Sequence, residues 1–200
     1  MIRALVATAV VLACVGCSDG SDEPASSASD TASASASEAT PTAPTSSAAA
    51  ADGPEISGTG YSYHVPKGWG RPPQEVPGFD PDSLAGDLED EDGFTDNVNV
   101  IISPAGELTP EQAEGAAQSE LESAGADDPT VQDRLEVAGS ESAHVTAGMS
   151  RNGNDYTIEQ FYPSDDGRTF VVTFSFSNGL TAEERAAVTD AVLASWTWTD

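Results

Sequence analysis

The sequence has little of what cysteine-, histidine- or lysine-based sites require. Its only two cysteines, Cys14 and Cys17, lie near the N-terminus, so no disulfide can stabilise the rest of the chain. It contains two histidines and no H-E-x-x-H zinc motif, G-x-S-x-G elbow or phosphate-binding glycine loop. We therefore expect no catalytic residues, no metal ligands and no cofactor.

Basic residues are also scarce. The chain has 7 basic and 34 acidic residues, a formal charge of −27, and Lys67 is its only lysine. Such a surface repels phosphate backbones, which argues against nucleic-acid binding, and it also repels anionic lipid head groups. The acidic surface by itself favours solubility, and attraction of a basic partner or of cations is the alternative.

No apolar run reaches the roughly 20 residues that a membrane-spanning helix needs. Residues 1–16 are a short positive start followed by an uncharged apolar stretch, which is typical of a cleaved export signal. Gly16-Cys17, followed by polar residues, resembles the lipobox of bacterial lipoprotein signals. Cys17 is the predicted lipid-attachment residue, Cys14 is the rival, and simple secretion with a free cysteine is the remaining alternative. Lipid on Cys17 would hold the chain at the outer face of the plasma membrane.

Large apolar residues are nearly absent from residues 17–52, which are rich in Ser, Ala, Thr and Pro. This composition predicts a disordered tether with an end-to-end distance of roughly 33 Å, open to O-glycosylation. Residues 53–200 are long enough for a single domain and carry 28 acidic and 6 basic residues. We expect this domain to be a monomer.

Two helices are predicted within 53–200. Thr109-Pro110-Glu111-Gln112 is a capping box with proline at the first helical position, and alanines and Leu121 follow on one face up to Gly125. Thr181-Ala182-Glu183-Glu184 repeats the capping box ahead of a second apolar face that ends near Ser195.

Alternating apolar residues predict strands at 61–65, 97–102, 143–149, 156–162 and 168–177. Turn sequences at 152–155 and 164–167 separate the last three, which should form an antiparallel meander. Trp196 and Trp198 alternate in a final short strand. Helices packed on an antiparallel sheet make an α+β domain.

Several sequence segments, taken in their order along the chain, give this domain a resemblance to a known family. They are a strand followed by the turn Val65-Pro66-Lys67-Gly68-Trp69, the strand from Asn97, the helix after Thr109, the segment 137–143, the strand 170–176 and the last helix. In this order they resemble the PsbP/Mog1-like α/β/α sandwich of actinobacterial envelope lipoproteins of the LpqN/LpqT type, over about residues 57–198. The resemblance implies a mostly antiparallel sheet flanked by helices and a non-enzymatic accessory role.

Three further features have a structural and a functional interpretation. Trp69 is expected to close one end of the core, with stacking on a ligand as its functional alternative. His64 and His144 fall in strand patterns and are expected to be sheet residues rather than bases. The acidic segment 79–96 is expected to be a solvated loop, although its start at Asp80 resembles a calcium-binding loop without the required glycine.

These observations leave three functions open. The first is a lipid-anchored, non-enzymatic binding or assembly factor of the bacterial cell envelope, with envelope proteins or cell-wall lipids as partners. The second is a carrier of a small lipid or sugar, held under the alanine-rich helix 113–124. The third is an envelope hydrolase.

Overall fold

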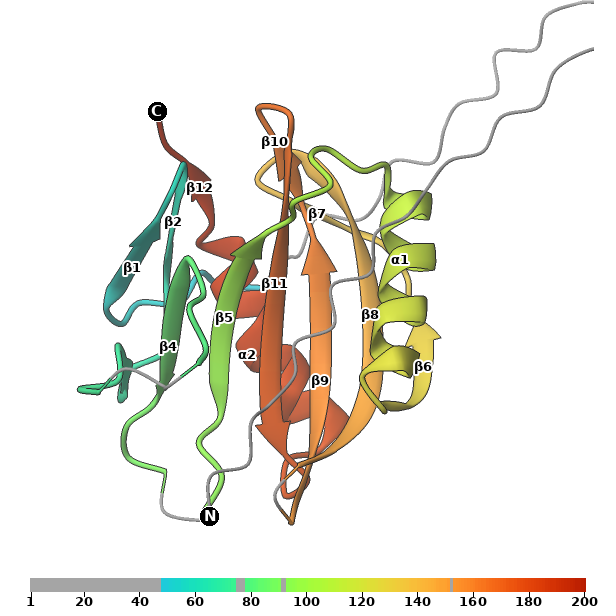
Figure 1. Ribbon diagram of the computed structural model, residues 1–200. Helices are drawn as coiled ribbons and strands as arrows, with labels where there is room; N and C mark the ends of the chain where they lie inside the picture. Colours follow the sequence, from blue (N-terminus) through green and yellow to red (C-terminus); the bar gives the residue numbers. More distant parts are fainter. Residues whose placement is uncertain (1–47, 75–77, 91–92, 152) are drawn as a thin grey trace, which may run out of the picture. The chain divides into compact units, whose positions relative to one another are not determined.

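The computed structural model describes residues 48–200 except 75–77, 91–92 and 152 (Figure 1). Cys14, Cys17, the predicted signal and most of the predicted tether lie outside the described residues. The strands are β1 (Glu55–Gly58), β2 (Tyr61–His64), β3 (Trp69–Gly70), β4 (Ser83–Asp87), β5 (Asn97–Ile102), β6 (Asp127–Val131), β7 (Leu135–Val137), β8 (Ser140–Arg151), β9 (Asn154–Tyr162), β10 (Ser164–Asp165), β11 (Arg168–Ser177) and β12 (Thr197–Trp198); the helices are α1 (Pro110–Ser123) and α2 (Ala182–Ala194).

The predicted meander forms the centre of the structure. β8 pairs with β9, and β9 with β11, both antiparallel. The turn before β11 has positive φ at Asp166 and Gly167, +47° and +74°, as a two-residue hairpin requires. The central sheet runs in the order β3-β4-β5-β11-β9-β8-β6, and a separate three-stranded sheet has the order β1-β2-β12. All strand pairs are antiparallel, as the fold prediction expected.

Both helices begin at the predicted caps. The Thr109 side chain accepts from the Gln112 N–H while the Gln112 side chain accepts from the Thr109 N–H, and Thr181 and Glu184 repeat this arrangement. These reciprocal bonds satisfy backbone donors that a helix start otherwise leaves free.

The two helices lie on opposite faces of the central sheet. Val192 and Leu193 of α2 share a core with Phe174 and the other even-numbered apolar residues of β11. Ala113, Ala117 and Leu121 of α1 pack against alanines, Val145 and Ile158 of β8 and β9. Figure 1 shows α1 in front of the sheet and α2 behind it. Alternation along the strands, with a period of two, thus divides the apolar side chains between two cores.

The small sheet is attached to the α2 face by aromatic residues. The Trp196 ring stacks on both Tyr61 and Tyr63, at centroid distances of 4.6 and 5.2 Å. Both tyrosine hydroxyls reach Ser83 Oγ on β4, at 2.8 and 3.2 Å. Burial raises the pKa of Tyr63 to about 12, so its hydroxyl keeps its proton in this contact.

One expectation about the acidic segment 79–96 is wrong. It was expected to be a loop, but its middle forms β4, which pairs with β3 and β5 inside the central sheet. Ser-Leu-Ala-Gly-Asp has few β-branched or aromatic residues, so its local preference for a strand is weak. The backbone hydrogen bonds of β4 with β3 on one side and β5 on the other stabilise the strand despite this weak preference.

Candidate functional site

The α1 face of the central sheet is only partly covered. α1 contacts β8 and β6 at one side of the sheet, and in Figure 1 no described helix lies in front of β4, β5 and β11. Ile101, on β5 between the other two strands, keeps 42% of its surface exposed. We call this region, built from the α1-side residues of β4, β5 and β11, the open face.

The open face carries no charge, although a fifth of the whole chain is charged. Strand register places its side chains in rows across the three strands. One row joins Gly86, Asn97 and Ser175, the next joins Leu84, Asn99 and Thr173, and a third pairs Ile101 with Val171. The open face is therefore a neutral surface of small polar and apolar groups within a strongly acidic domain.

Hydrogen bonds order the polar groups of this face. The Asn99 amide donates to the Thr173 carbonyl at 3.4 Å, and the Gln160 amide donates to Thr173 Oγ1 at 3.0 Å. Tyr162 Oη donates to Gln160 Oε1 at 2.8 Å. These bonds fix the side chains before any ligand arrives, which lowers the entropy cost of binding.

A hollow of about 450 Å³ opens at one end of the open face. Its floor includes Gly86 and Ser175, and loop residues Phe79 and Phe94 form walls. The Phe94 ring stacks on Tyr156 of β9 at 4.8 Å, which joins the loop after β4 to the sheet. Its volume and aromatic lining are those of a small-molecule site.

The single charge among the described lining residues is Arg151, at the end of β8. Within the described part of the chain, the Arg151 side chain forms no ion pair and no hydrogen bond. The other described basic side chains have partners: Lys67 pairs with Asp52, Arg134 with Glu114, Arg168 with Asp166 and Arg185 with Glu159, and Arg71 donates to the Ser57 carbonyl. Arg151 is therefore a guanidinium available to a ligand.

A second hollow, of about 610 Å³, lies near the start of α1. Glu107, Glu141 and Asp165 line it together with Trp198, whose Nε1 donates to the Ala138 carbonyl at 3.1 Å. It is polar and acidic, whereas the hollow on the open face has no acidic residue among its described lining. We call the latter the neutral hollow, since its lining is uncharged apart from Arg151.

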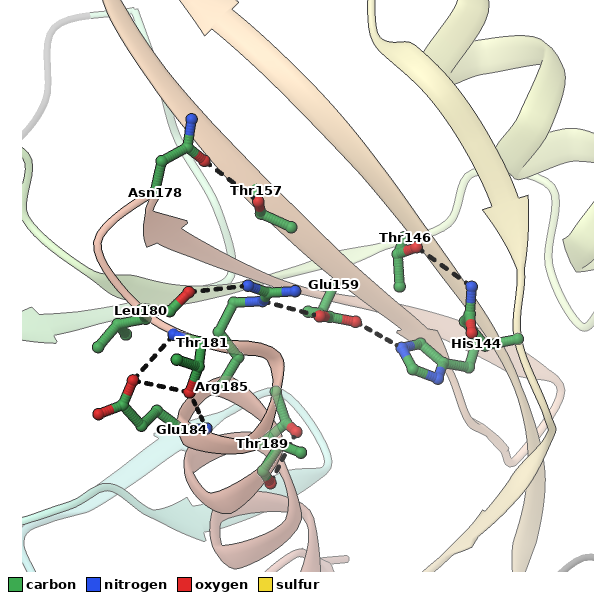
Figure 2. A network of polar contacts seen from close by, with 12 residues as sticks. His144, Thr146, Thr157, Glu159, Asn178, Leu180, Thr181, Glu184, Arg185 and Thr189 are labelled. Carbon is green, nitrogen blue, oxygen red and sulfur yellow. Dashed lines mark hydrogen bonds and ion pairs between the residues drawn. The ribbon is translucent and has the colours of Figure 1, made fainter.

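The histidines take sheet positions, as expected, but His144 belongs to a partly buried network (Figure 2). Glu159 Oε2 lies 2.8 Å from His144 Nε2, and Glu159 Oε1 lies 3.2 Å from Arg185 Nε. Arg185 also donates to the Leu180 carbonyl at 3.1 Å. Because a carboxylate only accepts, the imidazole Nε2 donates to it. The network ties α2 to β8 and β9.

Neither hollow includes this network, and no serine hydroxyl bonds to an imidazole ring within the described residues. His64 Nδ1 instead lies 2.9 Å from the Gly53 carbonyl. Asp190 of α2 also lies near His144, where burial raises the pKa of its carboxyl and the His144 charge opposes the rise. The arrangement is that of a structural ion-pair network.

The acidic segment 79–96 forms hydrogen bonds with other parts of the fold where the structure describes it, and calcium binding there stays an untested alternative. Asp82 accepts from the Thr59 N–H at 2.8 Å and from the Thr59 hydroxyl at 2.7 Å. Glu91 and Asp92 lie outside the described residues. Within the described residues, no group of three or more His, Cys, Asp or Glu side chains is placed to hold a metal.

Trp69 lies in β3 and in the larger core, with 6% of its surface exposed. Its ring thus acts as a core residue, and stacking on a ligand stays an untested prediction. The residues that line the neutral hollow were not singled out from the sequence. Phe79, Phe94, Arg151 and Tyr156 come from distant segments, and no spacing links them.

The sequence matches no protein-family model and no curated protein. Solved structures do match. LpqN of Mycobacterium tuberculosis, described as involved in cell envelope biogenesis, is 15% identical over 74% of this chain and 90% of its own, with a TM-score of 0.51. The cyanobacterial PsbP of Synechocystis sp. PCC 6803 is 17% identical over 73% of this chain and 92% of its own, with a TM-score of 0.50.

These likenesses confirm the fold prediction: the chain has a PsbP-like α+β fold, similar to that of LpqN. At 15 to 17% identity these similarities show the fold alone and do not show the function. No helix in the described part of the chain is long and apolar enough to cross a membrane.

Proposed function

We propose that this chain is a non-enzymatic binding component of the bacterial cell envelope, held at the outer face of the plasma membrane by lipid on Cys17. The apolar N-terminal stretch that ends at Gly16-Cys17 supports export and lipid attachment. The fold shared with LpqN, a protein of cell envelope biogenesis, agrees with the same compartment.

The observation that carries the binding role is the open face. A sheet face that no described helix covers, free of charge within a domain of net charge −22, presents area that a partner or ligand can cover without burying a carboxylate. Exposed Ile101 and the aromatic hollow give this face its apolar contacts.

The anchor is tested by palmitate labelling of cells that express the wild type, Cys17→Ala or Cys14→Ala. Label should enter the wild type and Cys14→Ala and be lost from Cys17→Ala, which should leave the membrane fraction. Label that persists in Cys17→Ala and disappears in Cys14→Ala would move the anchor to the rival residue, and an unlabelled, secreted wild type would contradict the proposal.

The binding role is tested by crosslinking in intact envelopes. A charge placed on the open face, Ile101→Asp, should abolish recovery of the crosslinked partner because burying an unpaired carboxylate is costly. Leu88→Asp is the matched control: Leu88 is 54% exposed and does not line either hollow. Equal recovery with both variants would remove the open face from the proposal.

The neutral hollow favours a second candidate function, a carrier of a small ligand. The expected space under the alanine-rich helix is filled, because Ala113 and Ala117 pack directly against the sheet. A carrier would instead use the hollow of about 450 Å³ beside Phe79 and Phe94, on the part of the sheet that α1 does not cover.

A further inference from the structure

The walls of the neutral hollow divide into an apolar part and one charged point. Phe79, Leu84, Phe94 and Tyr156 supply carbon surface, and Phe79 keeps 38% of its area exposed. Arg151 supplies the single charge, and no described lining residue is acidic. The complement of this lining is an apolar body that bears one negative charge.

Uncharged side chains, some of them apolar, continue from the hollow along the open face. The row that includes Gly86 lies four residues along the strands from the pair Ile101 and Val171, about 14 Å at 3.4 Å per residue. Leu84 lies between these rows. An elongated apolar group can therefore lie along the sheet with one end in the hollow.

We propose that the neutral hollow binds the carboxylate of a single-chain amphiphile at Arg151, with the alkyl chain packed on Phe79, Phe94 and Leu84. The planar guanidinium offers two parallel N–H donors that match the two oxygens of a carboxylate. Moving the alkyl chain from water into the hollow contributes roughly 0.8 kcal/mol of binding free energy for each buried CH₂. This inference rests on the proposed binding role and names the chemical class of its ligand.

Charge favours a carboxylate over a phosphate monoester. A carboxylate carries one charge, which one guanidinium balances, whereas a phosphate monoester carries about −1.5 to −2 near neutral pH. The remaining negative charge of the phosphate would have no second described cation in the hollow to balance it. It would also be repelled by a domain with 28 acidic and 6 basic residues. At physiological salt the Debye length is about 8 Å, so carboxylates farther away than this are largely screened, while a direct contact at Arg151 is screened less.

The test is isothermal titration calorimetry of the full 200-residue chain with dodecanoate below its micellar concentration. Arg151→Gln should weaken dodecanoate binding about fivefold, since Arg151 is exposed and its ion pair is partly screened. Lys67→Gln removes the same charge at a residue outside the hollow and should bind as the wild type does. Phe79→Ala should weaken binding of any dodecyl chain.

Uncharged dodecyl maltoside separates the head group from the chain. It should bind more weakly than dodecanoate to the wild type and equally to the wild type and Arg151→Gln. The inference is overturned if dodecanoate does not bind, if Arg151→Gln binds it unchanged, or if dodecyl maltoside binds more tightly. Any of these results would leave the envelope location intact, because palmitate labelling and crosslinking test that separately.

Discussion

At the residue scale, Asp82 holds the turn between β1 and β2 against β4. Burial alone would raise the pKa of its carboxyl, but hydrogen bonds from the Thr59 backbone and hydroxyl and from Tyr61, with the charge of Arg168, outweigh burial and lower it. The folded chain therefore binds fewer protons at Asp82 than the unfolded chain does. By linkage, Asp82 contributes stability above about pH 4, and this contribution is lost as the pH falls through the folded pKa.

Asp82→Asn should lower the free energy of unfolding by about 1–2 kcal/mol at pH 7, because the amide cannot accept both Thr59 bonds through the same pair of oxygens. Urea denaturation at pH 7, 5 and 3 measures the difference in unfolding free energy between the variant and the wild type, which should shrink as the pH falls below about 4. Asp80→Asn, an exposed acid two residues earlier, should have little effect. A gap that stays constant or widens on acidification would contradict this account.

The residues of the neutral hollow could not be predicted from the sequence. Phe79 and Phe94 lie in a segment whose acidity dominates its composition, and β4 passes between them. Arg151 and Tyr156 flank a hairpin turn, where residues ordinarily serve the turn itself. Each residue has an ordinary local role, and the pairing of β4 with β5 and of β9 with β11 brings them together.

At the element scale, the two helices and the strands 97–102 and 168–177 could be predicted because their signals are local. Thr109 with Gln112, and Thr181 with Glu184, form bonds within three residues. Strands β1, β3, β4, β6, β7 and β10 were not predicted. They are short or carry polar residues on exposed faces, so partner strands rather than local pattern define them.

Gly115 weakens the middle of α1. Its added Cβ would meet no atom within 4 Å, so a methyl group fits without a clash. Gly115→Ala should therefore raise the free energy of unfolding by about 0.5–1 kcal/mol, since alanine loses less backbone entropy in a helix. Thermal unfolding followed by circular dichroism measures this gain.

Gly125→Ala is the matched control for that substitution. Gly125 also has open space around its Cβ position, but its φ is +82°, so alanine there should destabilise the protein. A loss of stability in Gly115→Ala would show that α1 does not tolerate side-chain area at this position.

At the scale of the whole molecule, repulsion among acidic groups opposes folding. Residues 53–200 hold 28 acidic against 6 basic residues, and four of the basic ones already form ion pairs. Raising NaCl from about 20 mM to about 500 mM should stabilise the fold by roughly 1 kcal/mol, or about 2–4 °C in the unfolding midpoint, by screening this repulsion.

Calcium chloride at matched ionic strength distinguishes general screening from specific binding. An equal rise in the midpoint would assign the effect to screening alone. A much larger rise with calcium would support a cation site in segment 79–96, and a fall with NaCl would contradict the repulsion argument.

The contact between Ala51 and α2 sets where the chain enters the domain. The Ala51 N–H donates to the Ala191 carbonyl at 2.8 Å, on the side of the sheet opposite the open face. Ala51 is therefore held on the face of the sheet opposite the hollow. A ligand in the hollow would then lie on the face of the sheet that this backbone contact does not use.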